Sequence, residues 1–371
     1  MSKTKFKSIN FKNNNHKDFA VTLRKRVDNY FSSKKIEKTG DYRIWIKVVV
    51  LPLMYFLPFA VILSNLVVDS YLITYGLWCM MGVGIAGCGL GIMHDANHGA
   101  LSSNKKVNNF IGFIINFAGG YALNWKIQHN VLHHTYTNID GYDEDIDPSG
   151  LMRFSPNQPH KSFFKYQVVY AWFLYGLMTL SWATNKDFAQ IKRYNKMGLV
   201  KAQGLNYKVE FVKMVSLKVL YYAFFIVLPL YLTSLPWYHI VLGWLTMHFT
   251  SGLILGCVFQ PAHCIPETDF PIPDTDNTVE ADSLVHQMHT TANFSNGSRL
   301  FSWYIGGLNY QIEHHLFPQV SHIHFSKLAP IVKKTAEEFG IPYRASTTYW
   351  QAIERHTRML KALGNSPQMA A

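Results

Sequence analysis

The sequence predicts an all-α integral membrane protein with four transmembrane helices in two hairpins, interfacial helices and a cytosolic cap that carries histidine clusters. Hydrophobic residues make up 49% of the 371 residues and charged residues only 16%, a balance that favours a membrane protein. Four apolar stretches are long enough to cross a bilayer. Histidines gather where these stretches end, so the expected fold brings them to one side of the membrane.

The two expected hairpins cover residues 48–93 and 215–258. Their predicted spans are 48–68, 71–93, 215–235 and 237–258. Only two residues separate the spans of the first hairpin, and the second hairpin turns at Pro236. The second span contains six glycines, which allow another helix to approach closely. It ends directly at the first histidine cluster.

Three other segments are not expected to cross the bilayer. Residues 110–123 are apolar but too short to cross, so they are expected to be re-entrant or interfacial. Residues 168–184 are of borderline length and are expected in the interface. Residues 19–31 carry apolar side chains at helical spacing. This pattern is typical of a surface helix against the lipid headgroups, and a solvated lysine-rich arm is the open alternative.

The distribution of charge selects the topology. If 168–184 crossed the membrane, the lysine-rich loop 186–213 would be external and His263 would face away from the other histidines. If it lies in the interface, all 35 Lys and Arg lie on one side or at the helix ends that border it. The positive-inside rule therefore predicts four crossings, with the cap and both termini cytosolic. The net charge of +12 does not indicate nucleic acid, because no binding motif accompanies it.

Three histidine clusters carry the candidate chemistry. In the first two, the pairs His94 with His98 and His129 with His133 are each four residues apart, so each pair shares one helix face, and His134 follows the second pair. The third cluster contains Gln311, His314 and His315 on one side of a short helix that ends at Pro318. Neutral imidazole needs a partner for each nitrogen, and a metal ion is the expected partner. Imidazole suits iron, zinc, copper and nickel, so the ligand type alone leaves the metal open.

These clusters resemble the three histidine boxes of the membrane-bound fatty acid desaturase family, over about residues 48–318. Gln311 stands where most members have the first His of box three, which is similar to the front-end branch of the family. Enzymes of that branch insert a double bond between an existing one and the carboxyl end. The His-Pro-Gly-Gly haem motif of the family's fused cytochrome b5 module does not occur in this sequence.

The resemblance implies a centre of two non-haem iron ions, with O₂ as co-substrate, that introduces a cis double bond into a fatty acyl chain, as in a linoleoyl-CoA-like desaturase. The implied metal ligands are His94, His98, His129, His133, His134, His263, His314 and His315. Gln311 is either a weak ligand or a hydrogen-bond donor beside the metals. The acyl carrier is CoA or a lipid, and the two electrons come from a separate ferredoxin or cytochrome b5.

The resemblance also implies a division of the chain. It consists of a basic cytosolic segment at 1–43, a desaturase domain at 44–318 with boxes at 94–98, 129–134 and 311–315, and a cytosolic tail at 319–371. A lipid hydroxylase on the same scaffold is the nearest alternative function. A histidine-rich metal transporter fits less well, because the spans hold almost no ionisable residue apart from Lys218.

Supporting contacts to the histidines are expected from carboxylates, which commonly accept the second N–H of a metal-bound imidazole. At least one acid of the loop 140–147 is expected in this role, and Asp95 and Glu313, inside the boxes, are the better candidates. The remaining histidines are not expected to bind metal. His286, His289, His322 and His324 are interpreted as polar-loop residues, and His16, His160, His239, His248 and His356 as ordinary surface or interface residues.

Overall fold

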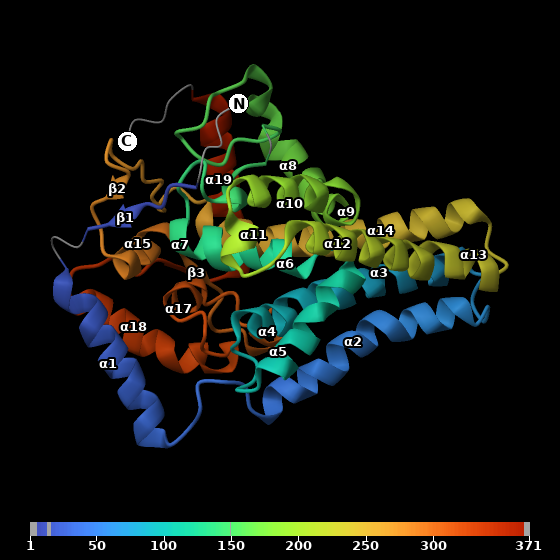
Figure 1. Cartoon of the computed structure of the whole chain (residues 1–371), viewed down its shortest axis with the longest axis horizontal. Helices are drawn as coiled ribbons and strands as arrows, with labels where there is room; N and C mark the ends of the chain where they lie inside the picture. The colour runs from blue at the N-terminus through green and yellow to red at the C-terminus, as the bar shows by residue number, and fades with distance from the viewer. Residues whose placement is uncertain (1–5, 13–15, 149, 367–371) are drawn as a thin grey trace.

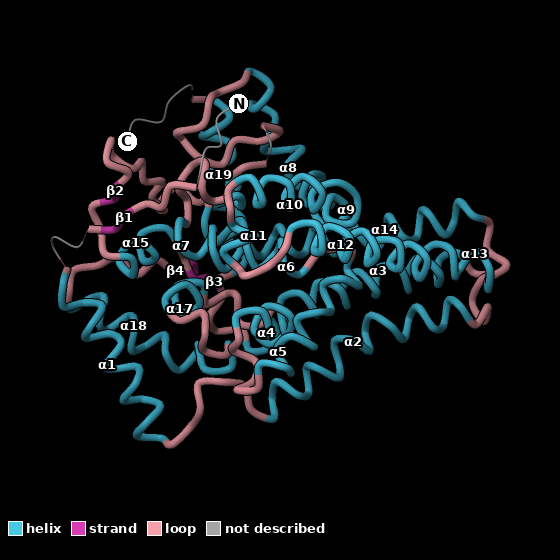
Figure 2. The backbone as a smooth tube through the Cα atoms, in the orientation of Figure 1, coloured by secondary structure: helices cyan, strands magenta, loops and turns pink. Residues whose placement is uncertain are grey.

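The four expected membrane helices dominate the computed structural model, which describes residues 6–12, 16–148 and 150–366. The expectations for the first and last residues of the chain lie outside these ranges. Figure 1 shows long helices extending together toward one end of the molecule, while shorter helices and loops form a cap at the other. Figure 2 shows how little strand there is. The all-α membrane fold predicted from the sequence is therefore confirmed.

The spans are longer than the sequence indicated. They are α2 (Tyr42–Leu63), α3 (Tyr71–Cys88) continuing through η1 (Gly89–Met93) and α4 (His94–His98), α12 (Tyr207–Tyr222) continuing through η7 (Ala223–Val227) and α13 (Leu228–Leu232), and α14 (Trp237–His263). The turns of the two hairpins lie against each other, because Asn65 Nδ2 donates to the Leu232 carbonyl at 2.7 Å. Both hairpins therefore return to the same end, where the cap lies.

Glycines in α3 let the neighbouring helices approach at backbone distance. A Cβ atom on Gly84 would lie 2.6 Å from the Tyr55 amide nitrogen, and one on Gly82 would lie 2.5 Å from the Met247 carbonyl oxygen. Side chains at these positions would push α2 and α14 away from α3. The close packing expected from the glycine-rich span is present.

The two interfacial segments break into short helices. Residues 110–123 fall in α5 (Lys105–Gly112) and η2 (Phe113–Ala118), and residues 168–184 fall in α8 (Gln167–Gly176), α9 (Met178–Ser181) and η6 (Trp182–Lys186). Neither segment is among the four helices of the described residues that are long and apolar enough to cross a membrane. Phe110, Phe113 and Phe117 remain exposed, which suits contact with lipid.

The N-terminal helix is correctly expected, but its predicted surroundings are wrong. Along α1 (Lys17–Lys34), the apolar side chains Phe19, Leu23, Val27 and Phe31 are buried against α18 (Phe325–Glu338). Arg26 also pairs with Glu338 at 2.6 Å. The apolar face is covered by a helix that follows the third box, a tertiary contact that helical periodicity does not reveal.

The cap is completed by short helices and two small strand pairs. The helices are α6 (Ala122–Lys126), η3 (Ile127–His133), α7 (His134–Tyr136), η4 (Glu144–Ile146), η5 (Ser162–Tyr166), α10 (Asp187–Lys196), α11 (Leu199–Ala202), α15 (Ser283–Thr290), α16 (Arg299–Tyr304), α17 (Gln311–Leu316), η8 (His322–His324) and α19 (Tyr349–Asn365). Strand β1 (Asn10–Phe11) pairs in parallel with β2 (Thr278–Val279), and β3 (Asn293–Phe294) with β4 (Ala345–Ser346).

Candidate metal centre

The first two boxes lie on or beside π-helical turns. The π-turn η1 interrupts the α3 span directly before His94, and η3 itself carries His129 and His133. A π-turn inserts an extra residue into a helix and so changes which side chains face a given direction. The α4 segment then ends at Gly99, whose φ of 77° is in the left-handed region.

The third box is brought close to the first by two glycines that precede α17. Gly306 and Gly307 have φ values of 64° and 66°. A Cβ atom on Gly306 would lie only 2.0 Å from the Leu90 carbonyl oxygen, and one on Gly307 would lie 2.9 Å from the His322 Cβ. Glycine is required here by both the backbone conformation and the close approach. The α17 helix can therefore pack beside η1 and α4.

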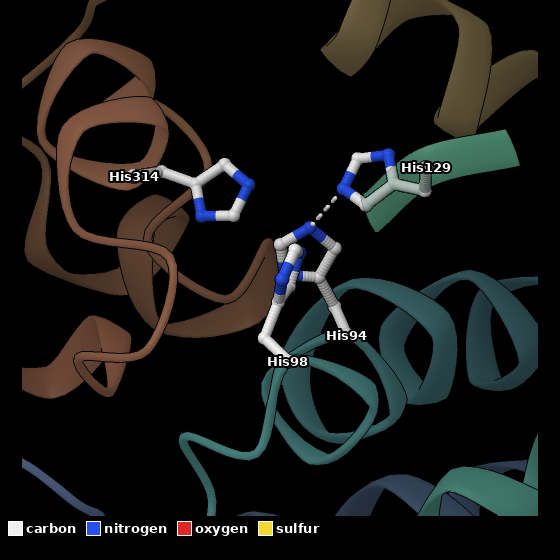
Figure 3. Close-up of side chains that lie close together, drawn as sticks. All are labelled: His94, His98, His129 and His314. Atoms are coloured by element: carbon white, nitrogen blue, oxygen red, sulfur yellow. Dashed lines mark hydrogen bonds between the residues drawn. The ribbon is translucent and has the colours of Figure 1, made fainter. Parts of the chain in front are cut away.

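The three boxes converge in space. Figure 3 shows His94 and His98 from one helix facing His129 and His314, which come from two other segments. A ring nitrogen of each of these four histidines lies within 4.8 Å of the others, and His94 Nε2 is 3.0 Å from His129 Nε2. A second group contains His133, His263 and His315, whose ring nitrogens also lie within 4.8 Å of one another. A third group, within the same distance, contains His134, His314 and His315. All eight histidines predicted from the sequence are thus brought together.

The chemistry of these imidazoles fits metal ions. The Nε2 atoms of His98, His263, His314 and His315 are buried and have no hydrogen-bond partner within the described part of the chain. Leaving such an atom without a partner costs about 1–3 kcal/mol. Burial, together with the neighbouring imidazoles, keeps the pKa of His129, His134, His314 and His315 well below the usual value. They are neutral, which leaves a lone pair for a metal.

One acid of the loop after the second box holds a box histidine, as expected. Both carboxylate oxygens of Asp143 lie 3.1 Å from His133 Nδ1, and its Oδ2 accepts from the Asn138 backbone N–H. Burial alone would lower the pKa of His133, but Asp143 and Asp145 raise it to about 9. Binding of a metal at His133 Nε2 would therefore release a proton.

Contrary to the prediction, the two acids inside the boxes, Asp95 and Glu313, contact residues other than the clustered histidines. Asp95 Oδ2 lies 2.9 Å from His322 Nδ1 and accepts from Ser321 Oγ at 2.7 Å. Glu313 accepts hydrogen bonds from Asn293 and Tyr343, and burial raises its pKa to about 7. Each acid is adjacent in sequence to a box histidine, and adjacent residues on a helix face different directions.

Gln287 on α15 is a supporting residue that the sequence did not indicate. Its Oε1 lies 2.7 Å from His315 Nδ1, and its Nε2 donates to the His134 carbonyl at 2.8 Å. It therefore fixes the second and third boxes relative to each other. No motif spacing links residue 287 to the boxes, so only the fold reveals this contact.

Gln311 lies beside His263 and is 1% exposed. Its amide nitrogen has no hydrogen-bond partner among the described residues. The side chain is thus at the edge of the second histidine group, where its amide N–H groups can donate to a ligand or a water molecule.

The other histidines differ from expectation in burial. His248 and His356 are fully buried, not ordinary surface residues, with their Nε2 atoms 2.6 Å from the hydroxyls of Tyr221 and Tyr175. His286 and His322 are also buried. Among the described residues, the potential metal-binding groups do not include His286, His289, His322 or His324.

Two adjoining cavities lie beside the histidines. The larger, of about 480 Å³, runs between apolar side chains from His94 and Trp125 to Tyr55 on α2. The smaller, of about 200 Å³, shares Ile115, Trp125 and Trp182 with the first. Its other lining residues include Tyr121, Gln128, Asp187 and Gln190. An apolar space and a polar space therefore meet next to the first histidine group.

Comparisons with known proteins agree with this geometry. The family described as Fatty acid desaturase matches residues 70–347. The sn-1 linoleoyl-lipid 6-desaturase of Synechocystis sp. is 32% identical over 94% of this chain and 96% of its own length. The sn-1 linoleoyl-lipid 6-desaturase of Arthrospira platensis is 31% identical over 95% and 94%, and the Acyl-lipid (8-3)-desaturase of Physcomitrium patens is 33% identical over 97% and 75%.

Replacement of single clustered histidines by alanine is expected to reduce bound iron. Each variant removes one nitrogen from a group of three or four, so His94→Ala and His315→Ala should each lose about half of the iron and all detectable product. His289→Ala is the matched control, because this imidazole pairs with Asp269 at 2.8 Å outside the groups. Iron per chain and product are measured on the same preparations. A variant with full iron would remove its histidine from the ligand set.

Proposed function

The chain belongs to the fatty acid desaturase family, and from this premise we propose that it acts on a lipid-linked acyl chain, adding a cis double bond between an existing double bond and the carboxyl end. It is a membrane oxidoreductase, a desaturase that depends on O₂. The observation that carries the finer proposal is the apolar cavity that reaches His94 and adjoins a smaller polar cavity.

The residues proposed to hold two iron ions fall into two sets. His94, His98, His129 and His314 form one, and His133, His263 and His315 form the other, with His134 close to both. When bound, a pair of iron ions supplies the activation of O₂ and the removal of hydrogen from an unactivated methylene. The imidazoles that burial keeps neutral support this assignment, because they offer nitrogen lone pairs in a site away from bulk water.

The larger cavity is proposed to hold the acyl chain. Its lining is predominantly apolar, as is usual for sites that bind an apolar ligand. Ile114, Ile115 and Phe259 line it and would exclude water from the chain. Trp125 stacks on His129 with ring centroids 4.5 Å apart, and His94 also lines the cavity. A methylene packed against Trp125 would therefore lie next to the first histidine group.

The smaller cavity is proposed to hold the polar end of the substrate. The Gln128 amide donates one N–H to Asp145 and keeps a second one for a ligand, and Asp187 pairs with Lys218 at 2.6 Å. Such a lining suits a neutral ester, which favours a glycerolipid over a charged carrier, and the lipid-linked substrates named for the relatives support this choice. Gln128 directly precedes His129, so the ester would lie close to the metal site, as front-end desaturation requires.

The electron donor and the orientation in the membrane complete the proposal. A separate acidic redox protein, a ferredoxin or a cytochrome b5, is proposed to supply the two electrons, because the net charge of +12 favours docking of an acidic partner. The cap is proposed to be cytosolic, supported by the positions of the Lys and Arg residues. Labelling from outside the cell of a cysteine introduced at the exposed Gln203 would contradict this orientation.

Expression in a host that supplies linoleate tests the proposed function. We expect a new cis double bond on the carboxyl side of the existing ones, in the acyl chains of glycerolipids and without added oxygen. Mass spectrometry of the separated lipid and acyl-CoA fractions after a short labelling pulse measures both the product and its carrier. A hydroxylated product would indicate the sister oxygenase, and label appearing first in acyl-CoA would contradict the lipid-linked substrate.

Gln311 variants test whether the amide takes part in the site. Gln311→Ala is expected to keep most of the iron but to lose most activity, because the neighbouring histidines remain while the amide does not. Gln311→His is expected to bind iron well but to turn over more slowly than the parent. Iron content and product are measured for both in the same membranes. Parental activity in Gln311→Ala would exclude the glutamine from the site.

A further inference from the structure

A buried lysine in the first membrane helix lies next to the region of the boxes. Lys47 on α2 is 2% exposed, and its Nζ lies 2.5 Å from His322 Nε2. The same atom lies 5.4 Å from the centre of the Trp303 ring. Placing a cation inside a membrane helix is costly, so such residues face partners within the protein and mark functional positions.

The contact continues from His322 to Asp95. His322 Nδ1 lies 2.9 Å from Asp95 Oδ2, and the backbone N–H of His322 donates to the same oxygen at 3.2 Å. A protonated Lys47 has donors only, so His322 Nε2 accepts from it, and the ring proton is then on Nδ1, the nitrogen that lies 2.9 Å from Asp95 Oδ2. The three side chains therefore form one connected polar group inside the protein.

This chain of contacts joins three segments that are distant in sequence. Lys47 is in α2, Asp95 directly follows His94 in box one, and His322 lies seven residues after His315 of box three. Boxes one and three also meet directly, with the rings of His94 and His314 4.4 Å apart. Asp95 and His322 therefore provide a second connection between the two boxes.

We propose that Lys47 and His322 are positioning residues that neutralise Asp95 and hold box three against box one, so that His94, His98 and His314 share one metal ion. The proposal rests on the proposed function only in that these histidines bind iron. Neither residue touches the acyl chain, the metal or O₂. Their effect reaches the reaction through the geometry and the charge surrounding the metal site.

Lys218 provides a matched control for the loss of a buried lysine in a membrane helix. It is 6% exposed and pairs with Asp187 at 2.6 Å, but it contacts no box histidine. If Lys47 only stabilises the fold, Lys47→Met and Lys218→Met should have equal effects on metal binding. A positioning role predicts that only Lys47→Met weakens it.

The experiment compares four variants as full-length proteins purified in detergent: Lys47→Met, His322→Leu, His322→Gln and Lys218→Met. Iron per chain is measured, and Co²⁺ is titrated into metal-free protein by its visible absorption. Lys47→Met and His322→Leu are expected to lose at least about half of the iron and to bind Co²⁺ about 10–100-fold more weakly. His322→Gln should stay within about twofold of the parent, because its amide can accept from Lys47 and donate to Asp95. Lys218→Met should keep the parental metal content.

A double variant checks the charge argument. Adding Asp95→Asn to Lys47→Met removes the anion that would be left without its cation, so part of the Co²⁺ affinity should return. Unchanged metal binding in Lys47→Met and His322→Leu would overturn the proposal, as would equal losses in Lys47→Met and Lys218→Met. If Lys47→Met gives no folded protein, the comparison of metal binding in His322→Leu and His322→Gln tests the proposal. If the parent and the Lys47→Met variant both bind iron and make product, this inference is wrong. The proposed function would then still hold.

Discussion

The structure depends on bringing eight imidazoles from distant segments together beneath the cap. Each unpartnered ring nitrogen there costs on the order of 1–3 kcal/mol, which a bound metal would recover. Several local features place or orient these histidines. They are the π-turns before and within the first two boxes, the left-handed Gly306 and Gly307, and the contacts of Asp143 and Gln287.

The membrane helices form the space that adjoins the histidines. They enclose an apolar space that opens onto the first histidine group, and a polar space adjoins it where η6 and α10 approach the second box. An acyl ester has the same division between a long apolar chain and a short polar end. A bundle standing in the bilayer with its histidines at one end can therefore take a substrate from the membrane while the redox chemistry stays in the cap.

Local sequence patterns predicted the spans, the interfacial segments and the histidine clusters, because hydrophobic length and residue spacing act over a few turns of helix. Contacts between distant segments were not predictable in this way. The apolar face of α1 is covered by α18, His248 and His356 bond to tyrosines on other helices, and Asp95 reaches His322 in place of a box histidine. Gln287 carries no motif, so its contact with His315 follows only from the fold.

The central claim is that the converging histidines form a site for two iron ions. The most direct measurement is anaerobic titration of the metal-free protein with ⁵⁷Fe²⁺, followed by Mössbauer spectroscopy before and after exposure to O₂. The account predicts two iron ions per chain, both in high-spin nitrogen-rich sites and magnetically coupled after oxidation. Saturation at one iron per chain, or two uncoupled irons that O₂ does not oxidise, would contradict it.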